Sequence, residues 1–69
     1  MNNFAQSIAD FSKVIDIYPN DPAAYGNRAF SYYQIKEYDK AWADIRKIQS
    51  LGSPVNPQLL NALKQATTP

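Results

Sequence analysis

Residues 21–35 read DPAAYGNRAFSYYQI and predict a helix with a well-marked beginning. Asp21 is a residue type favoured at the N-cap, and Pro22 suits the first helical position, where its missing N–H costs nothing. The apolar side chains that follow recur every three or four residues, which places them on one helical face: Tyr25, Ala29, Tyr32 and Ile35. We therefore expect a helix over residues 22–35, followed by a short turn at Lys36 and Glu37.

The segment before this stretch shows the same helical spacing. Its apolar residues are separated by steps of four and three: Phe4, Ile8, Phe11, Ile15 and Tyr18. Pro19 then interrupts the pattern, because proline cannot continue a helix. This stripe predicts a helix over about residues 3–18.

Two further helices are predicted downstream. The first, over residues 38–51, buries a face made of Tyr38, Ala41, Ile45 and Ile48, and Gly52 follows it as a typical C-terminal cap. Asn56 and Pro57 repeat the start signal of Asp21 and Pro22. They predict a short last helix over residues 57–66, whose apolar residues are Leu59, Leu60 and Leu63.

Together these patterns predict an all-α chain of four helices. All the connections are short, so neighbouring helices should run antiparallel as helical hairpins. At 69 residues the chain is long enough for a single small domain over residues 1–69.

The chain also resembles itself at an offset of 34 residues. Identical residues recur at this offset, as in Ala9 and Ala43, Asp10 and Asp44, and Lys13 and Lys47. Residues of similar class fill the positions between them, as in Ser7 and Ala41, Phe11 and Ile45, and Val14 and Ile48. The helices over residues 3–18 and 38–51 are therefore copies of one element, which is typical of stacked helical repeats.

These residues carry a resemblance to a known family. Tyr25-x-x-Arg28-Ala29-x-x-Tyr32, followed by Ala41-x-x-x-Ile45, resembles the tetratricopeptide repeat, a helical hairpin of about 34 residues. Arg28 departs from the pattern, which usually has leucine there. The resemblance implies an α-solenoid of about one and a half repeats: the second helix of an incomplete repeat (4–21), one complete repeat (22–53) and a C-terminal capping helix (56–66).

The resemblance also implies a function. Members of this family bind peptides in a concave groove lined by the first helix of each repeat, and that helix here is residues 22–35. Its face away from the core carries Asn27, Phe30, Tyr33 and Gln34, which we predict as a groove for a protein or peptide partner. Phe30 and Tyr33 have an alternative role, which is to pack against neighbouring helices.

A second functional hypothesis concerns the first helix, which lacks a hairpin partner. Its apolar stripe of Phe4, Ile8, Phe11 and Ile15 is predicted to be left partly open. That face would then serve either for self-association into a homo-oligomer or for docking within a longer repeat array. In this hypothesis the chain is a structural assembly unit.

Composition excludes several other classes of function. Seven basic and six acidic residues give a net charge of +1 without a basic block, so neither nucleic acid nor a membrane surface is predicted as a partner. The chain has no cysteine and no histidine, so we predict no disulfide, no metal site and no cofactor. No nucleophile is paired with a base, and we predict no catalytic residue and no enzymatic activity. The lack of cysteine and of a leader sequence favours a cytoplasmic location.

Four polar or aromatic features have structural interpretations. We expect Arg28 to lay its stem over the core and pair with a nearby carboxylate. The pairs Asp10 with Lys13 and Asp44 with Lys47 are predicted to be solvated on the outer helix faces. Trp42 is predicted to pack between hairpins.

Overall fold

The structure, a computed structural model, describes residues 3–68 and consists of helices joined by short loops. The helices are α1 (Phe4–Ile17), α2 (Pro22–Gln34), α3 (Tyr38–Ser50) and α4 (Pro57–Thr67). No strand occurs among residues 3–68. The predicted all-α class and the four predicted helices are confirmed, with ends that differ from the predicted ones by at most one residue.

The helix starts follow from their capping residues. The Oδ1 atoms of Asn3, Asp21 and Asn56 accept hydrogen bonds at 2.9–3.0 Å from the backbone N–H of Gln6, Ala23 and Gln58, respectively. Each bond satisfies a donor that has no partner inside its helix. In α2 and α4 a proline follows the cap at once, as the sequence predicts.

Two helices end in a left-handed residue that closes the last turn. After α3, Gly52 adopts φ +75°, and the N–H of Ser53 donates to the carbonyl of Ile48. After α2, Lys36 adopts φ +64°, and the N–H of Glu37 donates to the carbonyl of Tyr32 at 2.9 Å. Both endings have the hydrogen bonds of a Schellman motif, for which glycine is the preferred residue. Lys36 therefore holds a conformation that side chains with a Cβ disfavour.

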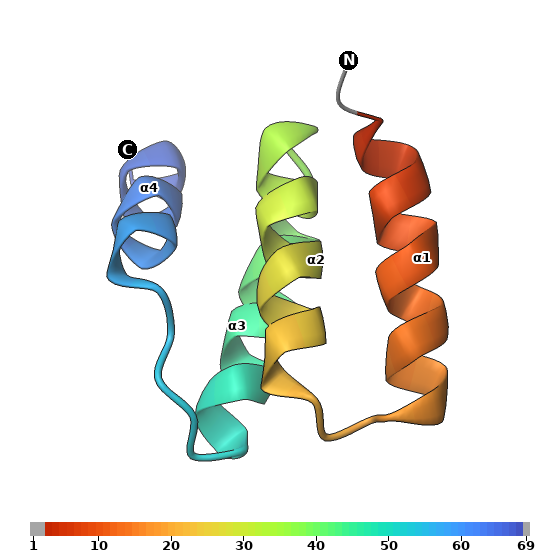
Figure 1. The fold of residues 1–69 in the computed structure, drawn as a ribbon. Helices are drawn as coiled ribbons and strands as arrows, with labels where there is room; N and C mark the ends of the chain where they lie inside the picture. Colours follow the sequence, from red (N-terminus) through yellow and green to blue (C-terminus); the bar gives the residue numbers. More distant parts are fainter. Residues whose placement is uncertain (1–2, 69) are drawn as a thin grey trace.

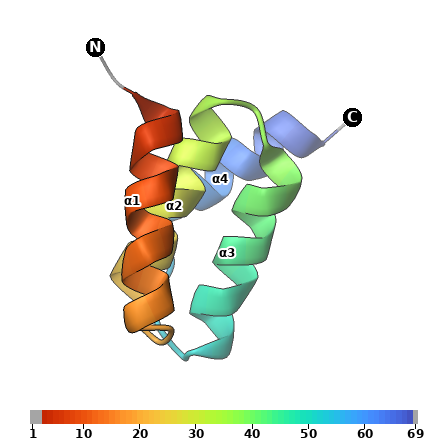
Figure 2. The ribbon, with the colours of Figure 1, turned by 90° about the vertical axis from the view of Figure 1, so that its right-hand side faces the viewer.

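The helices form two layers with α2 at the centre (Figure 1). α2 lies between α1 and α4, while α3 packs behind α2 as its antiparallel hairpin partner. Figure 2, turned by 90°, shows α1 in front of α2, with α3 to their right. Since α1 packs mainly against α2, it borders the bundle on one side.

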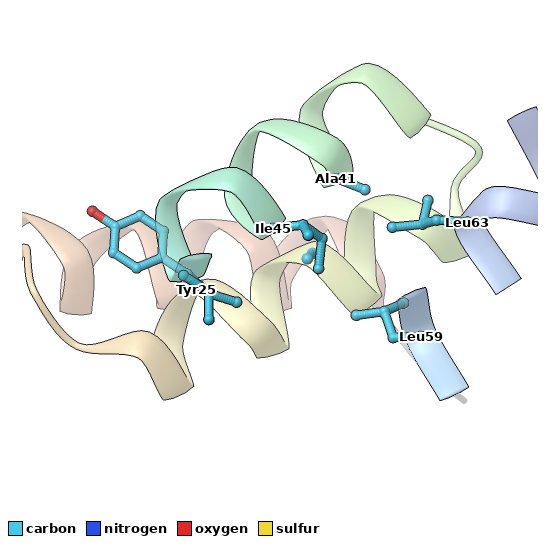
Figure 3. Packing of buried hydrophobic residues seen from close by; sticks show 7 residues of the cluster. Tyr25, Ala41, Ile45, Leu59 and Leu63 are labelled. Carbon is cyan, nitrogen blue, oxygen red and sulfur yellow. The ribbon is translucent and has the colours of Figure 1, made fainter. Parts of the chain in front are cut away.

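The core is made by α2, α3 and α4 (Figure 3). Its buried members are Tyr25, Ala29, Ala41, Ile45, Ile48, Leu59 and Leu63. Ala29 and Ala41 are fully buried, and their small side chains allow α2 and α3 to pack closely. The Tyr25 hydroxyl donates to the carbonyl of Pro19 at 2.8 Å, which ties the core to the turn between α1 and α2.

A polar cluster joins three of the helices. The Arg28 guanidinium in α2 donates from Nη2 to Asp44 Oδ1 at 2.6 Å and from Nε to Oδ2 at 2.9 Å. Its Nη1 donates to Ser12 Oγ in α1 at 3.1 Å. The guanidinium also lies within 5.7 Å of the ring centroids of Tyr25 and Tyr32, close enough for cation–π attraction.

The predicted carboxylate partner of Arg28 is therefore Asp44, and this expectation is confirmed. The hydrogen bond with Asp44 raises the pKa of Arg28 further above its ordinary value, although burial acts in the opposite direction. The prediction that Asp44 forms a solvated pair with Lys47 is wrong. Asp44 is only 3% exposed, because it faces α2 and meets a cation there.

Trp42 packs as expected, between α3 and the chain's last helix. It is half-buried against the core, and its indole N–H donates to Thr67 Oγ1 at 3.3 Å. None of the described helices is long and apolar enough to cross a membrane.

Candidate functional site

A hollow of about 550 Å³ lies between α2, α4 and the segment that joins α3 to α4. We call it the α2–α4 groove. On the α2 side it is lined by Ala23, Gly26, Asn27 and Phe30, and on the other side by residues that include Val55 and Leu59. Ile45 and Ile48 of α3 also line it. All its lining residues are uncharged, so the groove suits apolar side chains and backbone amides.

A second hollow of about 490 Å³ lies between α1 and α2, and we call it the α1–α2 cleft. Ser7 and Phe11 line it from α1, and Ser31 lines it from α2. Asn27 and Phe30 line the cleft as well as the groove. These two residues therefore form the wall that separates the two hollows.

Asn27 and Phe30 present different chemistry to the groove. Among residues 3–68, the Asn27 carboxamide has no hydrogen-bond partner, and the residue is exposed. Phe30 is 48% exposed, and its ring meets that of Phe4 edge to face with centroids 6.3 Å apart. An amide that can bind a peptide backbone therefore lies one helical turn from an aromatic surface.

The other two predicted groove residues lie elsewhere. Tyr33 is half-buried against the core, and its ring centroid is 5.9 Å from that of Tyr38. Gln34 is exposed at the last position of α2. Neither residue lines the groove or the cleft. Tyr33 thus has the packing contacts of the alternative interpretation.

Sequence reasoning missed one side of the groove. Ala23 shares a helical face with Asn27, four residues later, and that spacing was a usable signal. The loop residues Pro54 and Val55 had no such signal, because helical periodicity does not describe a loop.

All members of the predicted self-association face are half-buried: Phe4, Ile8, Phe11 and Ile15. Phe4 contacts Phe30 across the α1–α2 interface, and Ile15 packs against the core. The most exposed large apolar residues of α1 and its C-terminal turn are instead Ile17 and Tyr18.

The described residues do not assemble a metal site. Among residues 3–68, no group of three or more His, Cys, Asp or Glu side chains could hold an ion. Every buried side-chain nitrogen or oxygen in this part of the chain has a hydrogen-bond partner.

Comparison with protein families identifies a repeat family. Residues 11–43 match the model of a family described as tetratricopeptide repeat. The matched span begins inside α1, contains all of α2 and ends within α3. No curated protein and no solved structure matches the chain. The matched family suggests a protein–protein interaction module and is generally non-enzymatic.

Proposed function

Because the chain is a repeat protein of the tetratricopeptide type, we propose that it is a scaffold that binds an extended segment of a partner protein in the α2–α4 groove. The observation that carries this proposal is that Asn27 and Phe30 lie one helical turn apart and line the same hollow. An unpaired carboxamide and a half-exposed ring both face an uncharged hollow of about 550 Å³.

The groove offers an extended peptide two kinds of contact. The Asn27 carboxamide can donate to a peptide carbonyl and accept from a peptide N–H at once, which fixes the backbone direction. Phe30, Val55 and Leu59 supply the apolar surface for a side chain of the peptide. Since the groove carries no charge, we propose that the bound segment enters it with uncharged side chains.

α2 can bind a peptide without giving up its contacts with the core. Gly26 in the groove lining has no side chain, so a peptide backbone can approach the helix closely there. The core face of the same helix is held by Tyr25 and Ala29. Binding and folding therefore use opposite faces of α2.

The test begins with a library of random displayed peptides, from which those that bind the natural chain are selected. The dissociation constant of a selected peptide is then measured by fluorescence anisotropy for the natural chain and for Asn27→Ala. We expect Asn27→Ala to weaken binding by about tenfold, because a hydrogen-bonding pair is lost, while circular dichroism shows unchanged helicity.

Asn61→Ala is the matched control. Asn61 is the copy of Asn27 at the 34-residue offset and is exposed on α4, but it lines neither hollow. Equal affinity of the natural chain and Asn27→Ala would rule out the groove as the peptide site. Loss of helicity in Asn27→Ala would show that Asn27 acts through the fold.

A further inference from the structure

α1 and α3 are copies in sequence but not in environment. In α3 the residues that face the bundle are buried: Ala41, Asp44, Ile45 and Ile48. Their copies in α1 are Ser7, Asp10, Phe11 and Val14, and none of them is buried. We call these four residues of α1 its outer face.

The difference follows from the neighbours of each helix. α3 is covered by α2 and by α4, whereas α1 packs mainly against α2 (Figures 1 and 2). The α1–α2 cleft borders the outer face, because Ser7 and Phe11 line it. The copies of these two residues in α3, Ala41 and Ile45, belong to the core that α3 shares with α2. The cleft therefore corresponds to the place that α2 occupies on α3.

The carboxylate of Asp10 indicates that a helix covering the outer face would carry a cation at this position. Its copy Asp44 is buried only because Arg28 of the covering helix neutralises it through two hydrogen bonds. Asp10 is exposed, and its Oδ1 accepts a single bond, at 2.9 Å, from Gln6 Nε2 of the same helix. A helix laid on the outer face in the manner of α2 would bring its residue equivalent to Arg28 to Asp10.

The outer face also limits the size of the residue that a covering helix can place against it. Ala29, which follows Arg28, is fully buried, as is Ala41 in the facing helix. Ser7 is the copy of Ala41 and is likewise small. The outer face thus favours a helix with a small residue at the crossing point, because a larger one would hold the two helices apart.

We propose that the outer face of α1 and the adjoining cleft form a docking site for an α-helix that carries an arginine followed directly by a small residue, as in Arg28-Ala29. The arginine pairs with Asp10, and the apolar face of the helix covers Phe11 and Val14. This site differs from the α2–α4 groove, which contains neither Asp10 nor Val14, although the groove and the adjoining cleft share Asn27 and Phe30 as their common wall.

The probe for the test is a peptide copy of residues 21–35, made helical by a covalent staple between the positions of Phe30 and Gln34, which are exposed in the chain. Its binding to the natural chain is measured by fluorescence anisotropy. We expect saturable binding that Asp10→Asn weakens by about tenfold or more, because a paired charge is lost. A peptide with Arg28→Gln should bind the natural chain as weakly as it binds Asp10→Asn.

Asp16→Asn is the matched control, because Asp16 is exposed on α1 and its copy is Ser50, which implies no cationic partner. Absence of binding by the stapled peptide would overturn the proposal, as would equal weakening by Asp10→Asn and Asp16→Asn. Light scattering measures the solution mass of the natural chain and so tests whether a second copy of this chain occupies the outer face. A dimer that Asp10→Asn dissociates would assign the outer face to another copy of this chain and would also overturn the proposal.

Discussion

Arg28 and Asp44 connect the two helices of the central hairpin through a two-point ion pair, with Nη2 and Oδ1 only 2.6 Å apart. The Asp44 side chain is 5% exposed and that of Arg28 19%. Taking such charges out of water costs free energy, and the pair recovers it only while both partners are present.

The first prediction is that single and double changes at this pair have opposite effects. Asp44→Ala leaves a partly buried guanidinium without its carboxylate and should lower the free energy of unfolding by about 3 kcal/mol. The double change Arg28→Leu with Asp44→Leu removes both charges and fills the space with apolar atoms, so its stability should lie near that of the natural chain or above it. Urea denaturation followed by circular dichroism measures both.

The expected loss is large relative to the whole stability of the chain. A chain of this length has a total stability of about 3–10 kcal/mol, so Asp44→Ala should shift the urea midpoint strongly, and at the low end of this range it is partly unfolded at room temperature. If the double variant were as unstable as Asp44→Ala, the ion pair would be a net source of stability instead of a device that requires both partners.

The second prediction concerns Lys36, whose φ of +64° lies in the left-handed region. Glycine adopts this conformation without the steric penalty of a Cβ, and it is preferred at this position of a Schellman motif. Lys36→Gly should therefore raise the free energy of unfolding by about 0.5–1 kcal/mol, measured by urea denaturation. Lys36→Ala keeps the Cβ and is the control, and it should not stabilise the chain. Equal stability of the two variants would show that the backbone conformation is not the cause.

The third prediction separates stability from binding at Gly26. A Cβ built there meets its nearest neighbour, Ile48 Cδ1, at 3.8 Å, which is an ordinary contact distance. Gly26→Ala should stabilise α2 by about 0.5–1 kcal/mol, because alanine is the better helix former. The same methyl group narrows the α2–α4 groove, so affinity for a selected peptide should fall while the melting temperature rises. Unchanged affinity would place the peptide elsewhere.

The helices were predictable because local signals define them. Asp21 with Pro22, and Asn56 with Pro57, mark helix starts by chemistry that acts within a few residues. The charge partner of Arg28 was predictable in kind, since a half-buried cation requires a carboxylate.

The environment of Asp44 was not predictable from its repeat copy. Asp10 and Asp44 belong to identical positions of the repeat, yet one is exposed and the other is covered by α2. Sequence similarity between copies fixes the helix and its faces, whereas the burial of a face depends on which other helices are present. For the same reason the groove wall at Val55 could not be read from periodicity, because the path of that loop depends on where α4 docks.

The last prediction concerns Leu63, which holds α4 to the core and so shapes the groove. Leu63 is fully buried, and α4 packs mainly against α3. Leu63→Ala removes its side chain from the core and should lower the free energy of unfolding by about 2–4 kcal/mol. Since Leu59 of the same helix lines the groove, loosening of α4 should also abolish binding of a selected peptide. Leu60→Ala, at the half-buried neighbouring position, is the control and should have a smaller effect on both measurements. Hydrogen exchange distinguishes the mechanisms: faster exchange confined to α4 is expected, whereas equal acceleration in α2 and α3 would contradict a locally anchored helix.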